Sequence, residues 1–158
     1  DREPIAVLQI AHGVAEHILR YDDFARYLND RGILVAGHDH LGHGKSLPEG
    51  GTPVYFGDGS TWETVVDDIH LLHDRLREQY PDLPILLMGH SMGSFLSRSY
   101  LIRYPGTVDA AIIMGTGYRN AAEGSQIEKR PAAGGNSVRA QGAGRRQQDG
   151  DEHGLRGL

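Results

Sequence analysis

Four short apolar runs, separated by stretches with helical spacing, constrain most strongly what this chain can fold into. The runs are residues 4–11, 33–36, 84–88 and 108–114. Between them lie three stretches whose apolar side chains recur every three or four positions, which is typical of amphipathic helices. These are residues 21–31, 61–80 and 94–104. Strands that alternate with helices of this length predict a parallel α/β sheet with flanking helices. We expect the first two strands to be buried on both faces, because their runs are almost continuously apolar.

Start and stop signals support the helical stretches. Ser60 and Glu63 fit a capping box, in which a hydroxyl and a carboxylate accept from free N–H groups at a helix start. Pro81 ends the same helix, and Gly32 ends the one before it. The sequence therefore predicts that the long helix begins immediately after Ser60.

The composition changes near residues 117–120. Residues 1–118 carry 9 Lys and Arg against 16 Asp and Glu, whereas residues 119–158 carry 7 against 5. The last 40 residues contain eight glycines, four large aliphatic side chains and no aromatic residue. Such a segment buries too little apolar surface to offset its chain entropy. We therefore expect a folded core over residues 1–118 and a low-complexity tail over residues 119–158 that is disordered or read in a shifted frame.

Charge and composition exclude several classes of function. The chain has no cysteine, which excludes disulfides, thiol nucleophiles and thiolate metal sites. A net charge of −5 and a pI of about 6.0 favour neither nucleic acid nor an anionic membrane as a partner. No apolar run approaches the ~18 residues of a membrane span, and no signal peptide opens the chain. The chain begins at Asp1, which suggests a processed or partial chain, and leaves the compartment open with the cytoplasm as the default.

The segment Gly89-His90-Ser91-Met92-Gly93 joins the third strand directly to the third helix. This is the Gly-x-Ser-x-Gly pattern of a nucleophile elbow, in the strand–turn–helix context that such a motif requires. The sharp turn would strain the serine backbone and expose its hydroxyl above a helix N-terminus. We therefore expect Ser91 to be a nucleophile and the Met92 N–H to be an oxyanion donor. The alternative is an ordinary surface turn.

A second oxyanion donor is expected from the loop after an earlier strand. His12-Gly13-Val14 ends the first strand, and Gly13 would let the backbone approach a substrate carbonyl. The Val14 N–H is the candidate donor. The alternative is that His12 and Gly13 form only a turn that ends the strand.

Three motifs in this order resemble one branch of the α/β-hydrolases. They are residues 12–17 with the following Arg20-Tyr21, residues 38–46, and residues 89–94. They resemble the lysophospholipase and monoacylglycerol lipase branch, often described as serine aminopeptidase-like, over about residues 4–118. The resemblance implies an α/β-hydrolase fold and hydrolysis of acyl esters or single-chain lipids through an acyl-enzyme. It implies Ser91 as nucleophile, Val14 and Met92 as oxyanion donors, and no cofactor; the oligomeric state is left open.

A serine nucleophile also needs a base and an acid, which follow it along the chain in this fold. After Ser91 the sequence has a single histidine, His153, in the tail, and Asp109 precedes its strand instead of following it. The resemblance further implies a strand pair before Pro4 and a lid after the fourth strand. We therefore expect an incomplete, N-terminal portion of a hydrolase with little turnover. A non-catalytic interaction module is the alternative.

Histidine spacing also raises the possibility of a metal site. His38, His40 and His43 form His-x-His-x-x-His, which resembles metallo-β-lactamase-like hydrolases, but Gly42 stands where that pattern has an aspartate. We therefore expect no metal. His70 and His73 are expected to be solvent-exposed on their helix. The adjacent Asp67 and Asp68 are expected to be solvated or a cap partner, not a carboxylate pair.

Residues next to the two candidate loops carry weaker expectations. His17, Arg20 and Tyr21 follow the oxyanion loop and could contact a lipid head group or merely pack at a helix start. His90 adjoins the nucleophile but is not a candidate base, because neighbours across an elbow point away from it.

Overall fold

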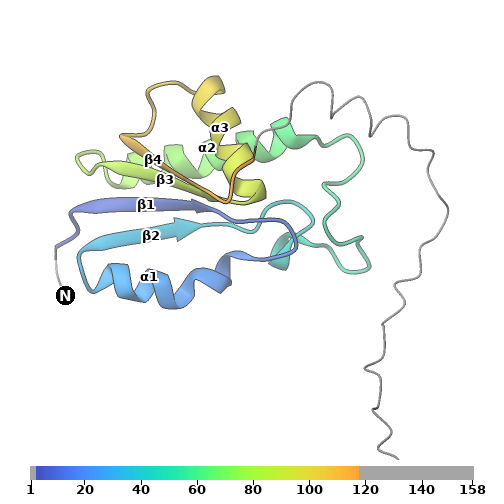
Figure 1. Ribbon diagram of the computed structural model, residues 1–158, viewed down its shortest axis with the longest axis horizontal. Coiled ribbons are helices and arrows are strands. Elements are labelled where there is room, and N and C mark those ends of the chain that lie inside the picture. Colours follow the sequence, from blue (N-terminus) through green and yellow to red (C-terminus); the bar gives the residue numbers. More distant parts are fainter. Residues whose placement is uncertain (1–2, 118–158) are drawn as a thin grey trace, which may run out of the picture. The chain divides into compact units, whose positions relative to one another are not determined.

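The computed structural model describes residues 3–117, and these form a four-stranded parallel sheet with helices on both faces (Figure 1). The strand order is β2-β1-β3-β4, and every pair is parallel. The strands are β1 (Ala6–Ala11), β2 (Ile33–Gly37), β3 (Ile85–His90) and β4 (Ala110–Met114). The helices are α1 (Asp22–Asn29), α2 (Trp62–Gln79) and α3 (Met92–Arg103), with short 3-10 turns η1 (Ile18–Tyr21) and η2 (Gly44–Ser46). The predicted parallel α/β architecture is confirmed; the tail over residues 119–158 lies outside the described residues.

Apolar clusters on the two faces of the sheet form the core. On one face, Val65, Ile69 and Tyr100 from α2 and α3 pack against β1 and β3. On the other face, Ile10 and the neighbouring strand residues pack against α1 and η1. Figure 1 shows α1 on the side of the sheet opposite α2 and α3. This arrangement places all strand C-termini, and so the loops that follow them, at one edge of the sheet.

The two edge strands are more exposed than their sequences suggest. β1 is buried as expected, since it pairs with β2 on one side and β3 on the other. The expectation that β2 is fully buried is wrong, because each of its residues is half-buried and it has one neighbour in the described sheet. β4 is mostly exposed for the same reason. Apolar character therefore indicated a strand, but not its place in the sheet.

The start of α2 differs from the expectation by one residue. Thr61, not Ser60, is the N-cap; its hydroxyl accepts from the Glu63 N–H, and its own N–H donates to the Thr64 hydroxyl. The capping box is therefore formed by Thr61 and Thr64. Threonine and serine hydroxyls cap in the same way, so the sequence offered two adjacent solutions.

The expected solvent exposure of His70 and His73 on α2 is also wrong. His73 is buried, and the half-buried His70 ring stacks on Tyr104 of the segment after α3, with 3.7 Å between ring centroids. Asp67 accepts a 2.6 Å hydrogen bond from the Tyr104 hydroxyl and pairs with Arg103 at 3.0 Å. These contacts join α2 to the end of α3, and Asp67 remains partly exposed to solvent.

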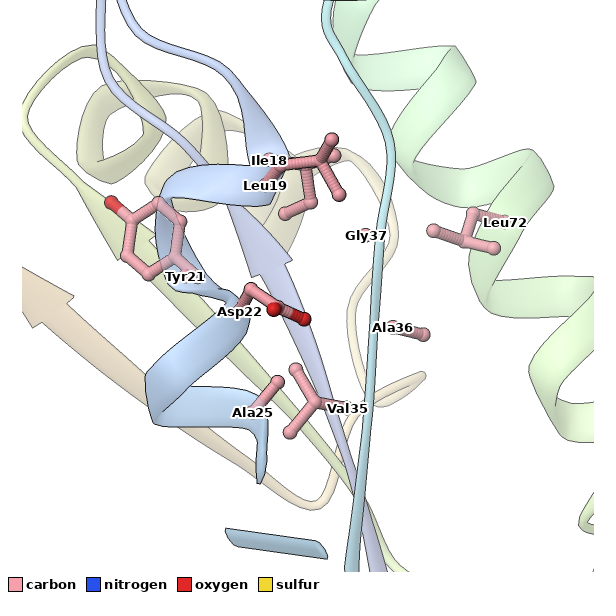
Figure 2. Close-up of a pocket in the computed structure, with 9 residues that line it drawn as sticks. All are labelled: Ile18, Leu19, Tyr21, Asp22, Ala25, Val35, Ala36, Gly37 and Leu72. Carbon is pink, nitrogen blue, oxygen red and sulfur yellow. The ribbon is translucent and has the colours of Figure 1, made fainter. Parts of the chain in front are cut away.

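A cavity of about 270 Å³ opens at β2, between α1 and α2 (Figure 2). Figure 2 shows Leu72 approaching it from α2 and Ala25 from α1, with Val35 on the strand between them. Asp22 is the only charged residue in its lining, and Ser91 is not part of it. This cavity therefore belongs to the sheet edge and not to the candidate nucleophile. Within residues 3–117, no helix combines the length and apolar character needed to cross a bilayer.

Candidate active site

Ser91 lies in a sharp turn between β3 and α3, with φ +52° and ψ −119°. A side-chain-bearing residue rarely adopts a positive φ, so its surroundings must hold this conformation in place. The Ser91 N–H donates to the Met114 carbonyl at 2.9 Å, and the Ser91 carbonyl accepts from the Ser94 N–H and hydroxyl. The predicted strand–turn–helix elbow is therefore present, with its serine strained and pinned from both sides.

The two elbow glycines are required by close approach. A Cβ on Gly93 would lie 2.6 Å from the Ala11 carbonyl carbon and 2.6 Å from the His12 carbonyl oxygen, and would overlap the Ala11 carbonyl oxygen. A Cβ on Gly89 would overlap the Gly93 carbonyl and the Ser97 hydroxyl. The glycines therefore allow the start of α3 to lie directly against the end of β1.

The structure brings the candidate oxyanion loop next to the elbow. Ala11 pairs with Gly89 in the sheet register, so the residues that follow both strands emerge side by side. A Cβ on Gly13 would lie 3.2 Å from the Ser91 Cβ. In the described part of the chain, the Val14 N–H donates no hydrogen bond, and Met92, as the first residue of α3, has no intrahelical acceptor. Both candidate donors are therefore free for a substrate oxygen.

Glu16 is the member of this site that the sequence reasoning missed. Its Oε1 accepts from the Gly13 N–H at 2.5 Å and from the Tyr21 hydroxyl at 2.9 Å, and lies 3.2 Å from His90 Nδ1. Burial raises the pKa of Glu16, but the hydrogen bonds from Gly13, His90 and Tyr21 outweigh it and hold the pKa below its ordinary value. Burial and the bond to Glu16 raise the pKa of Tyr21 to about 12. The available signal was a carboxylate five residues after the end of β1.

These contacts also locate the flanking residues. Arg20, whose side chain is exposed, pairs with Glu16 at 3.4 Å, and the Tyr21 hydroxyl donates to Glu16; contact with a lipid head group stays a prediction. His90 Nδ1 lies 3.2 Å from Glu16 Oε1, and the expectation that the ring points away from Ser91 stays a prediction.

His12 is fully buried and connects the loops after β1 and β2. Its Nδ1 lies 2.8 Å from the Gly13 carbonyl, and its Nε2 accepts from the His40 N–H at 3.0 Å. Burial lowers the pKa of His12 below its usual value. The imidazole is therefore neutral and acts as a link in the loop framework.

The three histidines of the possible metal motif do not converge. His38 and His40 lie edge to face with ring centroids 5.2 Å apart, and those of His40 and His43 are 6.5 Å apart. Burial lowers the pKa of His40 to about 2. Within residues 3–117, no three His, Asp or Glu side chains are placed to hold one metal ion. The carboxylate of Asp39, within this motif, accepts from the N–H groups of Ile18 and Lys45.

The described residues place no base or acid on Ser91. Asp109 precedes β4, and its carboxylate accepts from the Ile85 N–H at 2.8 Å at the start of β3. A five-residue strand spans about 17 Å, so Asp109 lies at the opposite end of the sheet from Ser91. The imidazole hydrogen bonds of residues 3–117 go to partners other than the Ser91 hydroxyl. His153 lies outside the described residues.

An apolar groove of about 240 Å³ includes Met92, the residue after Ser91, in its lining. It runs along one face of α3, where Met92, Phe95, Leu96 and Ser99 lie at helical spacing. Phe56 and Trp62 form its other wall. Such a surface can accept the hydrocarbon part of a ligand, but not a charged one.

Known proteins match this sequence and this arrangement. Residues 2–141 match a family described as serine aminopeptidase, S33. The monoacylglycerol lipase of Mycolicibacterium smegmatis is 38% identical over 115 residues, which are 73% of this chain and 39% of that protein. The monoglyceride lipase of Mus musculus is 42% identical over 94 residues, which are 60% of this chain and 29% of that protein.

Solved structures agree with the sequence matches. A thermostable carboxyl esterase from Bacillus coagulans, solved with glycerol, superimposes with a TM-score of 0.72 at 35% identity over 80% of this chain and 41% of that one. The chain thus spans about two fifths or less of the length of these relatives. The described sheet is part of an α/β-hydrolase fold, and the chain belongs to the serine aminopeptidase S33 family.

Proposed function

We propose that this chain carries the nucleophile and oxyanion hole of a serine hydrolase of carboxylic esters, of the monoacylglycerol lipase or lysophospholipase type. The observation that carries the proposal is the backbone of Ser91, held at φ +52° against Gly13 of the neighbouring loop. Strain of this kind costs about 1–3 kcal/mol and persists at functional sites.

The chemistry would proceed through an acyl-enzyme. The Ser91 oxygen bonds to the ester carbonyl carbon while its proton passes to a base, and the carbonyl oxygen takes up negative charge. The N–H groups of Val14 and Met92 stabilise that charge, aided by the N-terminus of α3. The bond to the alcohol then breaks, the alcohol leaves with a proton, and water hydrolyses the acyl-serine. Every step uses protein groups and water, so the proposal needs no cofactor.

The class of substrate follows from two observations. Two relatives are named as lipases of monoacylglycerols, and a third with a solved structure is named as a carboxyl esterase. The groove beside Met92 is apolar and suits an acyl chain better than a peptide. We therefore propose acyl esters or single-chain lipids, without choosing among monoglyceride, lysophospholipid and simple ester.

A non-catalytic interaction module is the second candidate function. It is favoured by the Ser91 hydroxyl, which has no imidazole partner among residues 3–117. Under this hypothesis the elbow and its strain remain while the base and acid do not, and the low turnover expected from the sequence follows.

Covalent labelling separates the two candidates. The full 158-residue chain is incubated with a fluorophosphonate, which labels activated serine hydroxyls, and the labelled residue is identified by mass spectrometry. The ester hydrolase predicts labelling at Ser91 that is absent in Ser91→Ala, whereas a folded wild-type chain without label supports the module. Hydrolysis of p-nitrophenyl butyrate by both proteins then measures turnover, and robust turnover lost in Ser91→Ala contradicts the expectation that this chain is nearly inactive.

A further inference from the structure

One peptide group in the candidate oxyanion hole is held from one side by a buried imidazole. A backbone N–H can only donate, so His12 Nε2, which receives the His40 N–H at 3.0 Å, carries no proton. The proton of the neutral ring is therefore on Nδ1, where it donates to the Gly13 carbonyl at 2.8 Å. In a trans peptide the C=O and the following N–H point in opposite directions. The imidazole therefore turns the Val14 N–H away from His12.

The other polar group of Gly13 is held by Glu16. The Gly13 N–H donates to Glu16 Oε1 at 2.5 Å, and the carboxylate side chain is only 7% exposed. Both polar groups of Gly13 are thus fixed by side chains, so the adjoining Val14 peptide has little freedom to rotate. The loop needs this support because Ala15 has a strained φ of +56°.

Glu16 also reaches the elbow. His90 Nδ1 lies 3.2 Å from the same oxygen that receives the Gly13 N–H, and His90 directly precedes Ser91. One carboxylate oxygen is therefore shared by the segment that bears Val14 and the segment that bears Met92. An oxyanion hole stabilises charge only when its donors are held about 3 Å from one point.

We propose that Glu16 and His12 are positioning residues that set the direction of the Val14 N–H and its separation from the Met92 N–H. They touch neither the substrate nor the reacting atoms. The inference rests on the proposed function, since it assigns these residues to the oxyanion hole of that reaction.

The first test measures the second-order rate of fluorophosphonate labelling of the full chain. Glu16→Ala should slow labelling at Ser91 about 10- to 100-fold, because a donor misplaced by about 1 Å loses much of its effect. Glu16→Gln should restore part of the rate, since its amide oxygen can still accept the Gly13 N–H.

Arg20→Ala is the matched control, because Arg20 is exposed and contacts the other carboxylate oxygen of Glu16 at 3.4 Å. It should stay within about twofold of wild type. If circular dichroism shows that Glu16→Ala is folded and Ser91 is still labelled at the wild-type rate, the proposal is overturned.

The second test does not depend on reactivity at Ser91. Nitrogen-15 spectra of the wild-type imidazoles at pH 7.5 should show His12 protonated at Nδ1 only. Glu16→Gln should shift the amide resonances of both Gly13 and Val14, whereas Arg20→Ala should leave them in place. A chain that is not labelled but shows these signals refutes the proposed function and keeps the positioning role. A His12 protonated at Nε2, or a Val14 amide unmoved by Glu16→Gln, refutes the positioning role itself.

Discussion

Replacing Gly93 by alanine tests whether the contact between α3 and β1 determines the elbow. Gly93 is the second residue of α3, where helix propensity alone would make alanine more stable than glycine by about 0.5–1 kcal/mol. The structure predicts the opposite sign. The added methyl would lie 2.6 Å from the Ala11 carbonyl carbon and 2.6 Å from the His12 carbonyl oxygen, where ordinary contacts begin at 3.4 Å.

The size of the destabilisation depends on which atoms would have to move to make room for the added methyl group. The opposing atoms belong to the backbone of β1, an inner strand, and of His12 directly after it, so neither can rotate away as a side chain would. The start of α3 must shift by about 0.8 Å or more, and overpacking of a close-packed interior costs about 1–3 kcal/mol, with larger values when the backbone itself must move. We therefore expect Gly93→Ala to destabilise the fold by about 3 kcal/mol.

Urea denaturation followed by circular dichroism measures this change. Gly106→Ala is the control, because Gly106 has a positive φ of +77° but open space around its Cβ position. It should cost only about 1 kcal/mol, from backbone strain alone. If Gly93→Ala is as stable as wild type or more so, helix propensity outweighs the contact, and the close approach of α3 to β1 does not require glycine at this position.

Two further predictions concern groups away from Ser91. Burial lowers the pKa of His12, His38, His40 and His73, so these rings stay neutral in the fold while the unfolded chain binds protons below about pH 6.5. Folding stability should therefore be complete above pH 7 and fall between pH 6.5 and 5, by up to about 1.4 kcal/mol per pH unit for each ring that remains neutral; a constant urea midpoint over this range would contradict it. Asp109→Ala removes the acceptor of the Ile85 N–H and should lower stability by about 1 kcal/mol, as measured by thermal denaturation. Because Asp109 lies at the far end of the sheet, the rate of labelling at Ser91 should not change, and a slowed rate would contradict that placement.

Local sequence patterns were sufficient to predict the strands, the α-helices and the turn that contains Ser91. Strand and helix spacing predicted the four described strands and three α-helices but not the two 3-10 turns, because hydrophobic periodicity reflects one face of a longer element. The Gly-x-Ser-x-Gly pattern predicted a strained Ser91, since only a turn of this shape explains glycines at both of those positions. The match of Ala11 with Gly89 in the sheet then placed the two candidate loops together.

The same patterns did not predict burial where it depends on a neighbouring strand or helix. The sequence of β2 predicts a buried strand, but β2 has one partner in the described sheet and is half-buried. Periodicity within a strand carries no information about strand order. His73 was predicted to be a surface residue, yet it is buried, because α3 packs beside α2 on the same face of the sheet.

The strands, the α-helices, the family and the strained serine could be predicted from the sequence, because each depends on residues close together along the chain. The contacts of Glu16 are visible only in the folded chain, where its carboxylate is bonded to both the loop after β1 and the elbow after β3. The physical reason is that a hydrogen bond between distant segments leaves no periodic signal in either of them. The register of a parallel sheet decides which loops meet, and therefore which side chains can share one oxygen atom.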